Sequence, residues 1–234
     1  MVKIGKGWII VLLFMPFVLN LFFNLALRLY VPSNLWSENP REAQIIFTSL
    51  LQTYGSPFMS FVQVVFGLYA AKNLRDVKAM YSREDLTRNS VLIILGLVFL
   101  SWILFMIEGV VNVVIQGISW EEYGVAWKES MKLTPLWSRL FTLIVGSLSA
   151  GVFEEIFWRG YGITMLEDSY GRRTALTLQA VAFGVWHIQP IHAAFATLIG
   201  VIYGYIFTKR RRLLTLSIAH WLTDFTGFYF SPLH

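Results

Sequence analysis

Four acidic residues of this sequence lie within long runs of apolar residues: Glu108, Glu154, Glu155 and Asp224. Ionisable side chains are costly in an apolar medium, so their presence there indicates a functional site or a paired network. Three of the four lie in the C-terminal half, which also contains the histidines His187, His192 and His220. Carboxylates and imidazoles brought together can perform general acid–base chemistry.

The first candidate motif is Glu154-Glu155-x-x-x-Arg159. On a helix, Glu155 and Arg159 share one face at i, i+4 and can form an ion pair that lowers the cost of burying both. Glu154 is then left as an unpaired carboxylate, which suits a general base or acid near neutral pH. The alternative is that all three residues form a packing network near a helix end.

The histidines give two further patterns, Phe183-x-x-x-His187 and His220-x-x-x-Asp224. The i, i+4 spacing puts His220 and Asp224 on one helix face, where the carboxylate can orient the imidazole. A single histidine such as His187 is either a hydrogen-bonding residue between helices or a catalytic group. We expect His192 to be an interface histidine, and Glu108 to serve helix packing or a separate polar contact.

The composition determines the elements that must position these residues. Apolar residues make up 56% of the 234 residues and charged residues 14%, whereas soluble domains have roughly 45–50% and about 25%. A bilayer accommodates this excess. The sequence therefore predicts an all-α, polytopic transmembrane helical bundle of about seven helices, which span residues 8–30, 45–71, 90–118, 136–166, 174–188, 191–208 and 213–230.

The fifth predicted helix is short, and Pro190 makes it a hairpin with the sixth. Counted from the inner boundary, the C-terminal motifs then fall within a slab roughly 10 Å thick, so groups from three helices can share one site. We predict one domain over residues 1–234, with a motif-bearing core at about 136–230.

The basic residues lie mainly in segments that are inside when the N-terminus is placed in the cytoplasm, as the positive-inside rule requires. We expect a multi-pass protein of a prokaryotic plasma membrane. The basic residues are scattered between apolar runs, which argues against a nucleic-acid partner. Residues 119–135 are expected to form either an interfacial helix or a simple outer loop.

Several catalytic classes lack their signatures in this sequence. The absence of cysteine excludes thiol nucleophiles and cysteine-based zinc sites. There is no His-Glu-x-x-His, the ligand motif that a site-2-type zinc protease needs, and no Gly-x-Ser-x-Gly, the motif around a nucleophilic serine. The small residues Gly146–Gly151, Gly200 and Gly204 are better explained by close helix packing.

The three motifs, in this order, resemble those of the CAAX protease and bacteriocin-processing (CPBP or Abi) family, which includes the type II CAAX prenyl endopeptidases. The resemblance implies a glutamate-type intramembrane peptidase acting on a peptide or membrane-protein substrate, near the C-terminus of a prenylated or membrane-associated chain. It implies Glu154 as the base that activates water, His187 as a residue that holds the water, and His220 in the oxyanion hole. Glu155 and Arg159 would position Glu154, and Phe183 would pack nearby.

Asp224 departs from the family, whose prenyl-protein proteases typically have asparagine at this position. An ionised aspartate cannot donate to an oxyanion. Our hypothesis is that Asp224 pairs with His220 and favours its protonated, donating form. No cofactor is expected. The alternatives are a zinc-dependent peptidase that uses Glu154, His187 and His220 as ligands, and a non-catalytic scaffold or bacteriocin immunity protein.

Overall fold

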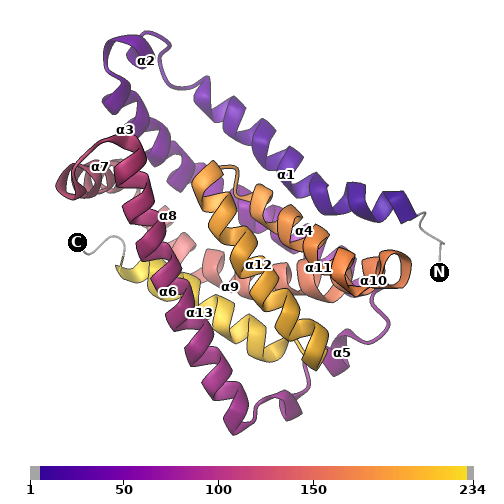
Figure 1. The fold of residues 1–234 in the computed structure, drawn as a ribbon. Helices are drawn as coiled ribbons and strands as arrows, with labels where there is room; N and C mark the ends of the chain where they lie inside the picture. Colours follow the sequence, from indigo (N-terminus) through magenta and orange to yellow (C-terminus); the bar gives the residue numbers. More distant parts are fainter. Residues whose placement is uncertain (1–5, 231–234) are drawn as a thin grey trace.

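The computed structural model describes residues 6–230, which are almost entirely helical and contain no strand (Figure 1). The predicted all-α bundle is confirmed. Seven long helical segments occur in the predicted order: α1 (Lys6–Arg28), α3 to α4 (40–73), α6 (Arg88–Gln116), α8 to α10 (136–170), α11 (Arg172–Trp186), α12 (Pro190–Arg210) and α13 (Leu214–Phe230).

Four of the described segments are long and apolar enough to cross a membrane: Gly7–Arg28, Arg88–Gln116, Leu136–Tyr170 and Pro190–Arg210. The surface of α6 supports this conclusion. It exposes large apolar side chains along most of its length, from Leu92 to Phe99, Val110 and Ile115. Such a large exposed apolar surface is unfavourable in water but suits contact with lipid chains, so a membrane environment accounts for it.

Two of the long segments are composite. The first consists of α3 (Pro40–Leu50), the π-helical turn η1 (Leu51–Gly55) and α4 (Ser56–Asn73). The second consists of α8 (Leu136–Phe141), η3 (Thr142–Gly146), α9 (Ser147–Ser149), η4 (Ala150–Ile163) and α10 (Thr164–Tyr170). The π-helical element η4 contains the first motif. Wide turns of this kind often occur at functional sites.

Two glycines allow the neighbouring helices to approach η4 closely. A Cβ on Gly67 of α4 would lie 2.6 Å from the Cβ of Phe153, and a Cβ on Gly151 would lie 2.7 Å from the Cβ of Trp221 on α13. Any larger residue would therefore push these helices apart. Because both approaches occur beside the two glutamates, α4 and α13 can reach them from opposite sides.

The hairpin of α11 and α12 turns at residues 187–189, and Pro190 is the first residue of α12. Gly200 and Gly204 lie against Ala180 and Leu176 of α11, so these small residues serve packing within the chain. Ile188 at the turn has a φ of 63°. A β-branched residue is strained in this left-handed region, so the surrounding structure must hold the turn in place.

Asp85 fixes the start of α13. Its carboxylate accepts hydrogen bonds from the backbone N–H and the hydroxyl of Thr215, at 2.8 and 2.7 Å, and forms an ion pair with Arg210 at 2.8 Å. The first N–H groups of a helix have no partner within the helix, so a carboxylate there stabilises its end. Asp85 thereby ties the end of α12 to the helix that carries His220.

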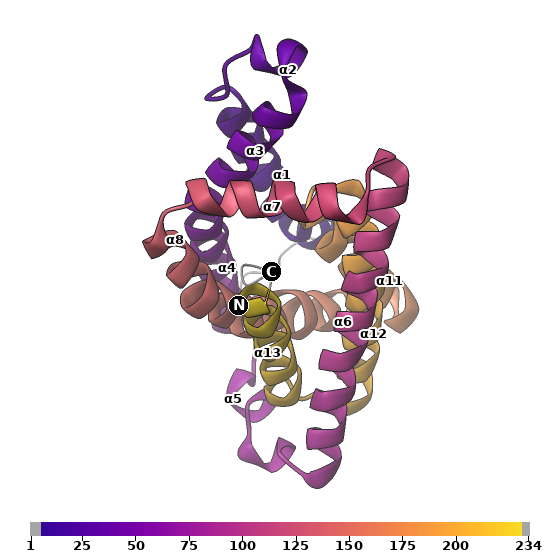
Figure 2. The ribbon, with the colours of Figure 1, turned by 90° about the vertical axis from the view of Figure 1, so that its left-hand side faces the viewer.

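The segment for which a helix and a loop were both possible is helical: α7 spans Trp120–Leu133 and runs crosswise to the end of α6 (Figure 2). A capping box begins it, because Ser119 accepts from the N–H of Glu122 while the Glu122 carboxylate accepts from the N–H of Ser119. These hydrogen bonds hold the pKa of Glu122 below its ordinary value. The interfacial position of α7 remains a prediction.

Candidate active site

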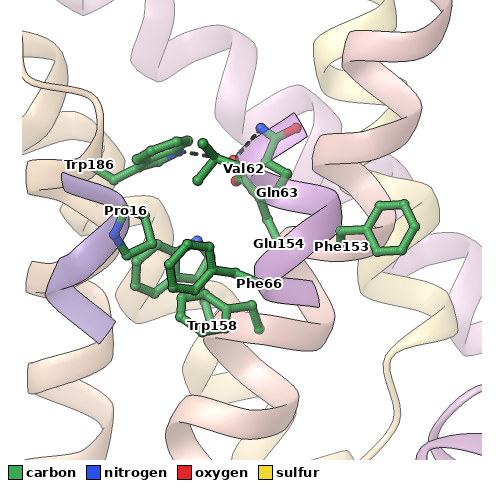
Figure 3. Close-up of a pocket in the computed structure, with 9 residues that line it drawn as sticks. Pro16, Val62, Gln63, Phe66, Phe153, Glu154, Trp158 and Trp186 are labelled. Atoms are coloured by element: carbon green, nitrogen blue, oxygen red, sulfur yellow. Dashed lines mark hydrogen bonds between the residues drawn. The ribbon is translucent and has the colours of Figure 1, made fainter. Parts of the chain in front are cut away.

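Glu154 is buried, with 4% of its surface exposed, and its two oxygens have different environments. Oε1 accepts hydrogen bonds from the Gln63 amide at 2.7 Å and from the Trp186 indole N–H at 3.1 Å (Figure 3). Oε2 has no hydrogen-bond partner among the described residues. The expectation of an unpaired carboxylate therefore needs a correction: Glu154 has two neutral donors, and they leave one oxygen free.

Gln63 is itself held in one orientation. The Ser149 hydroxyl donates to the Gln63 Oε1 at 2.6 Å, so the amide nitrogen of Gln63 points to Glu154. Because a hydroxyl donor fixes which end of the amide is the acceptor, Gln63 can only donate to the carboxylate. The first motif gave no indication of this partner, which lies 91 residues earlier in the chain.

Glu155 forms the predicted ion pair with Arg159, at 3.1 Å, and both side chains are fully buried. The same oxygen of Glu155 also accepts from the Nδ1 of His220 at 2.8 Å, a contact that spacing along one helix could not predict. The Arg159 guanidinium lies 4.1 Å above the Phe183 ring and 5.3 Å from the centroid of Tyr203. Glu155 therefore joins the first motif to the third.

His220 lies among three carboxylates. Its Nε2 is 3.9 Å from Oε2 of Glu154 and 3.7 Å from Oδ2 of Asp224, while its Nδ1 contacts Glu155. The predicted proximity of His220 and Asp224 is thus confirmed, although Glu155 makes the shorter contact with the ring. This arrangement directs one N–H of His220 to Glu155 and leaves Nε2 facing Glu154 and Asp224.

His187 directly follows the last residue of α11. Its Nδ1 lies 2.9 Å from the backbone oxygen of Phe183, and because a carbonyl only accepts, Nδ1 carries the hydrogen. In the neutral ring, Nε2 is then an acceptor. The Phe183 ring packs edge-on against His187 at 5.0 Å and against His220 at 6.2 Å, as expected for a residue that packs near the site.

Glu108, for which helix packing or a polar contact was expected, forms an interhelical pair with His192, the expected interface histidine. The His192 Nδ1 lies 2.9 and 3.0 Å from the two oxygens of Glu108, and its ring is 4.9 Å from that of His187. This pair joins α6 to α12 at the edge of the histidine cluster. Only tertiary structure brings the two together, since 84 residues separate them.

Tyr81, in the loop before α6, connects that loop to η4 and α13. Its hydroxyl lies 2.7 Å from that of Ser217 and donates to the backbone oxygen of Val152 at 3.3 Å. Burial raises the pKa of Tyr81 above its ordinary value, so the phenol stays neutral and can act as a donor. It thereby links η4 to α13 near both glutamates.

The space next to Glu154 is small. A pocket of about 10 Å³, lined by Gln63, Glu154 and Trp186 together with apolar side chains, would hold about one water molecule (Figure 3). Within residues 6–230, no group of three or more histidines and carboxylates is arranged to hold a metal ion.

Residues 135–226 match the family described as type II CAAX prenyl endopeptidase, Rce1-like. This region is an Rce1-like domain. The family is one of proteases, and its match here includes all three motifs. No curated protein and no solved structure matches the chain.

The Rce1-like domain contains all the site residues that the sequence indicated, but not all the residues that surround them. Gln63 and Glu108 lie before it, on α4 and α6. Trp186 lies within it, next to His187, where its aromatic character alone gave no reason to single it out. The part of the chain before residue 135 therefore contributes side chains as well as helices to the candidate site.

Proposed function

We propose that this membrane protein is an intramembrane endopeptidase in which Glu154 activates the attacking water. The observation that carries this proposal is the asymmetry of the Glu154 carboxylate. Two neutral donors hold Oε1, while Oε2 has no hydrogen-bond partner within residues 6–230 and faces Nε2 of His220 at 3.9 Å. A buried, fixed carboxylate with one free oxygen has the geometry of a general base.

His187 supplies the second contact for the water. Because its Nδ1–H donates to Phe183, its Nε2 can accept a hydrogen bond in the neutral ring. A water molecule that donates one hydrogen to Glu154 and the other to His187 keeps a lone pair for the peptide carbonyl. As the new C–O bond forms, the proton moves to Glu154, and the carbonyl oxygen becomes an oxyanion.

His220 is the proposed oxyanion donor. The carboxylates of Glu154, Glu155 and Asp224 around it favour its positively charged form, in which Nε2 also carries a hydrogen. Fixed donors at a developing negative charge are typically the largest single contribution to such catalysis. When the tetrahedral intermediate collapses, the C–N bond breaks, and Glu154 returns its proton to the leaving amine.

The proposed substrate is a peptide bond near the C-terminus of a prenylated or otherwise membrane-associated polypeptide. The proposed reaction needs no metal, since the carboxylate performs the activation. We further propose that the N-terminus lies in the cytoplasm and that the protein resides in a prokaryotic plasma membrane.

The test is proteolysis by the purified protein in detergent. A panel of fluorogenic peptides that includes farnesylated CAAX sequences would be incubated with the wild type and with Glu154→Ala, and the products would be identified by mass spectrometry. The proposal expects cleavage by the wild type alone. Equal cleavage by Glu154→Ala would refute the assigned base, and a folded wild type that cleaves no peptide would favour the scaffold alternative.

A further inference from the structure

A second, much larger space lies beside the turn that follows His187. A cleft of about 520 Å³ lies between α1, α3, α6 and the turn that joins α11 to α12. This volume lies in the range that binding sites for small ligands and short segments of chain occupy, roughly 300–1,000 Å³. The pocket beside Glu154, of about 10 Å³, has room for about one water molecule, so the length of a bound peptide must lie elsewhere.

The polar lining of this cleft has a distinct chemistry. None of the thirteen described residues that line it is acidic. Six of them carry side-chain N–H donors: Asn24, Arg28, Gln44, Asn112, Gln116 and Gln189. Carboxamides both donate and accept, as peptide groups do, so they are complementary to a backbone that lacks secondary structure. Among the described residues that line the cleft, Arg28 alone is charged, and it is exposed.

Arg28 is positioned to receive an anion. Its guanidinium lies over the Trp36 ring, 4.3 Å from the centroid, and this stacking holds one face of the group. The N–H groups at its edge stay available, since a stacked guanidinium donates in its own plane. The planar fork of donors matches a carboxylate.

Two sets of contacts join the cleft to the proposed catalytic residues. Asn24 donates to Asn20, Asn20 donates to the backbone oxygen of Trp186 at 2.7 Å, and the Trp186 indole donates to Glu154. On the turn, Ile188 and Gln189 line the cleft and directly follow His187. A chain lying in the cleft would therefore contact the turn that directly follows His187.

From these observations we propose that this cleft binds the polypeptide segment of the substrate on one side of the scissile bond, and that Arg28 pairs with a carboxylate of that segment. The inference rests on the proposed function, because it takes the occupant to be a peptide substrate. The carboxylate can be the C-terminus of the substrate or an acidic side chain. Either source would present the same two oxygens to Arg28.

The experiment compares matched peptides that differ in one charge. One pair carries a free or an amidated C-terminus, and a second series carries glutamate or glutamine at successive positions. For the wild type, we expect kcat/KM to be roughly tenfold higher for the peptide with the carboxylate, through KM. Arg28→Gln should abolish this preference, whereas Arg41→Gln, a matched change of an exposed arginine outside the cleft, should retain it.

A binding measurement separates this inference from the proposed function. In the Glu154→Gln background, fluorescence polarisation of the labelled peptides should show the same preference and its loss in the Arg28→Gln double variant. If the peptides with a carboxylate bind preferentially but the wild type cleaves none of them, the peptidase proposal is refuted and the proposal that the cleft binds a peptide carboxylate stands. Cleavage without a preference for the carboxylate would refute the proposal that the cleft binds the peptide through Arg28. If no peptide is bound by the Glu154→Gln variant and none is cleaved by the wild type, both the peptidase proposal and the cleft proposal are refuted.

A lipid control uses neutral nanodiscs with and without added anionic lipid. If Arg28→Gln has an effect only when anionic lipid is present, the occupant of the cleft is a lipid headgroup, and the peptide proposal is refuted.

Discussion

Gln63 offers a sharp test of how the site prepares its carboxylate. Its amide makes the shorter of the two hydrogen bonds to Glu154, 2.7 Å against 3.1 Å for Trp186. Gln63→Met keeps the length of the side chain and removes the donor. A hydrogen bond to a charged group contributes roughly 1.5–3 kcal/mol, which corresponds to roughly tenfold to hundredfold in rate if all of it favours the ionised, catalytic form of Glu154.

The pH dependence of kcat/KM shows whether Gln63 acts on the ionisation of Glu154. Without Gln63, the ionised form of Glu154 has lost a donor, so a higher pH is needed to produce it. We expect the acidic arm of the kcat/KM profile of Gln63→Met to move to higher pH, and the difference from the wild type to narrow at alkaline pH. Ser149→Ala, which frees the Gln63 amide, should change the profile in the same direction by a smaller amount.

The assay is steady-state cleavage of the best peptide from the panel, between about pH 5 and 9. Gln52→Met is the matched control, because Gln52 lies about three turns earlier on the same helical segment, in η1. An unchanged profile for a folded Gln63→Met would refute the role given to this amide. A uniform loss of rate at every pH would mean that Gln63 acts through packing alone.

Three further predictions concern the neighbours of the site. Asp224→Asn should lower kcat roughly tenfold or more, because it removes a carboxylate 3.7 Å from His220; a clear gain in kcat would contradict the pairing hypothesis. Asp85→Ala should lower the stability by about 2–3 kcal/mol and the Tm by roughly 5–10 °C, through loss of the buried Arg210 pair and the cap of α13; a Tm within about 2 °C of the wild type would contradict this. Glu108→Leu should lower kcat roughly tenfold by releasing His192 beside His187, while Glu108→Gln, which keeps an acceptor, should retain most of it; equal losses in the two variants would show that charge, not position, matters.

The helices were largely predictable because apolar runs of this length have few alternatives in a bilayer. Even the short α11 and its turn followed from Pro190 and the flanking charges. What the sequence could not predict is the π-helical geometry of η4 over residues 150–163, because no local preference of the sequence indicates it. The close approach of α4 and α13 at Gly67 and Gly151 likewise depends on tertiary packing.

The candidate site divides in the same way. Contacts within one helix, such as Glu155 with Arg159, followed from i, i+4 spacing and are present. The contacts of Glu154 with Gln63 and of Glu108 with His192 join helices far apart in sequence, so spacing carried no information about them. The role of Glu155 was underestimated for this reason, since its contact with His220 depends on how α13 packs against η4.

The central claim is that Glu154 is the general base of a metal-independent peptidase. The most direct measurement is kcat for Glu154→Gln beside the wild type, each with and without a strong chelator. The account predicts a loss of roughly 10²–10⁴ in kcat for a folded Glu154→Gln and an unchanged wild-type rate with the chelator. Wild-type-like turnover by Glu154→Gln would contradict the assignment of the base, and loss of wild-type activity with the chelator, restored by zinc, would contradict the metal-independent mechanism.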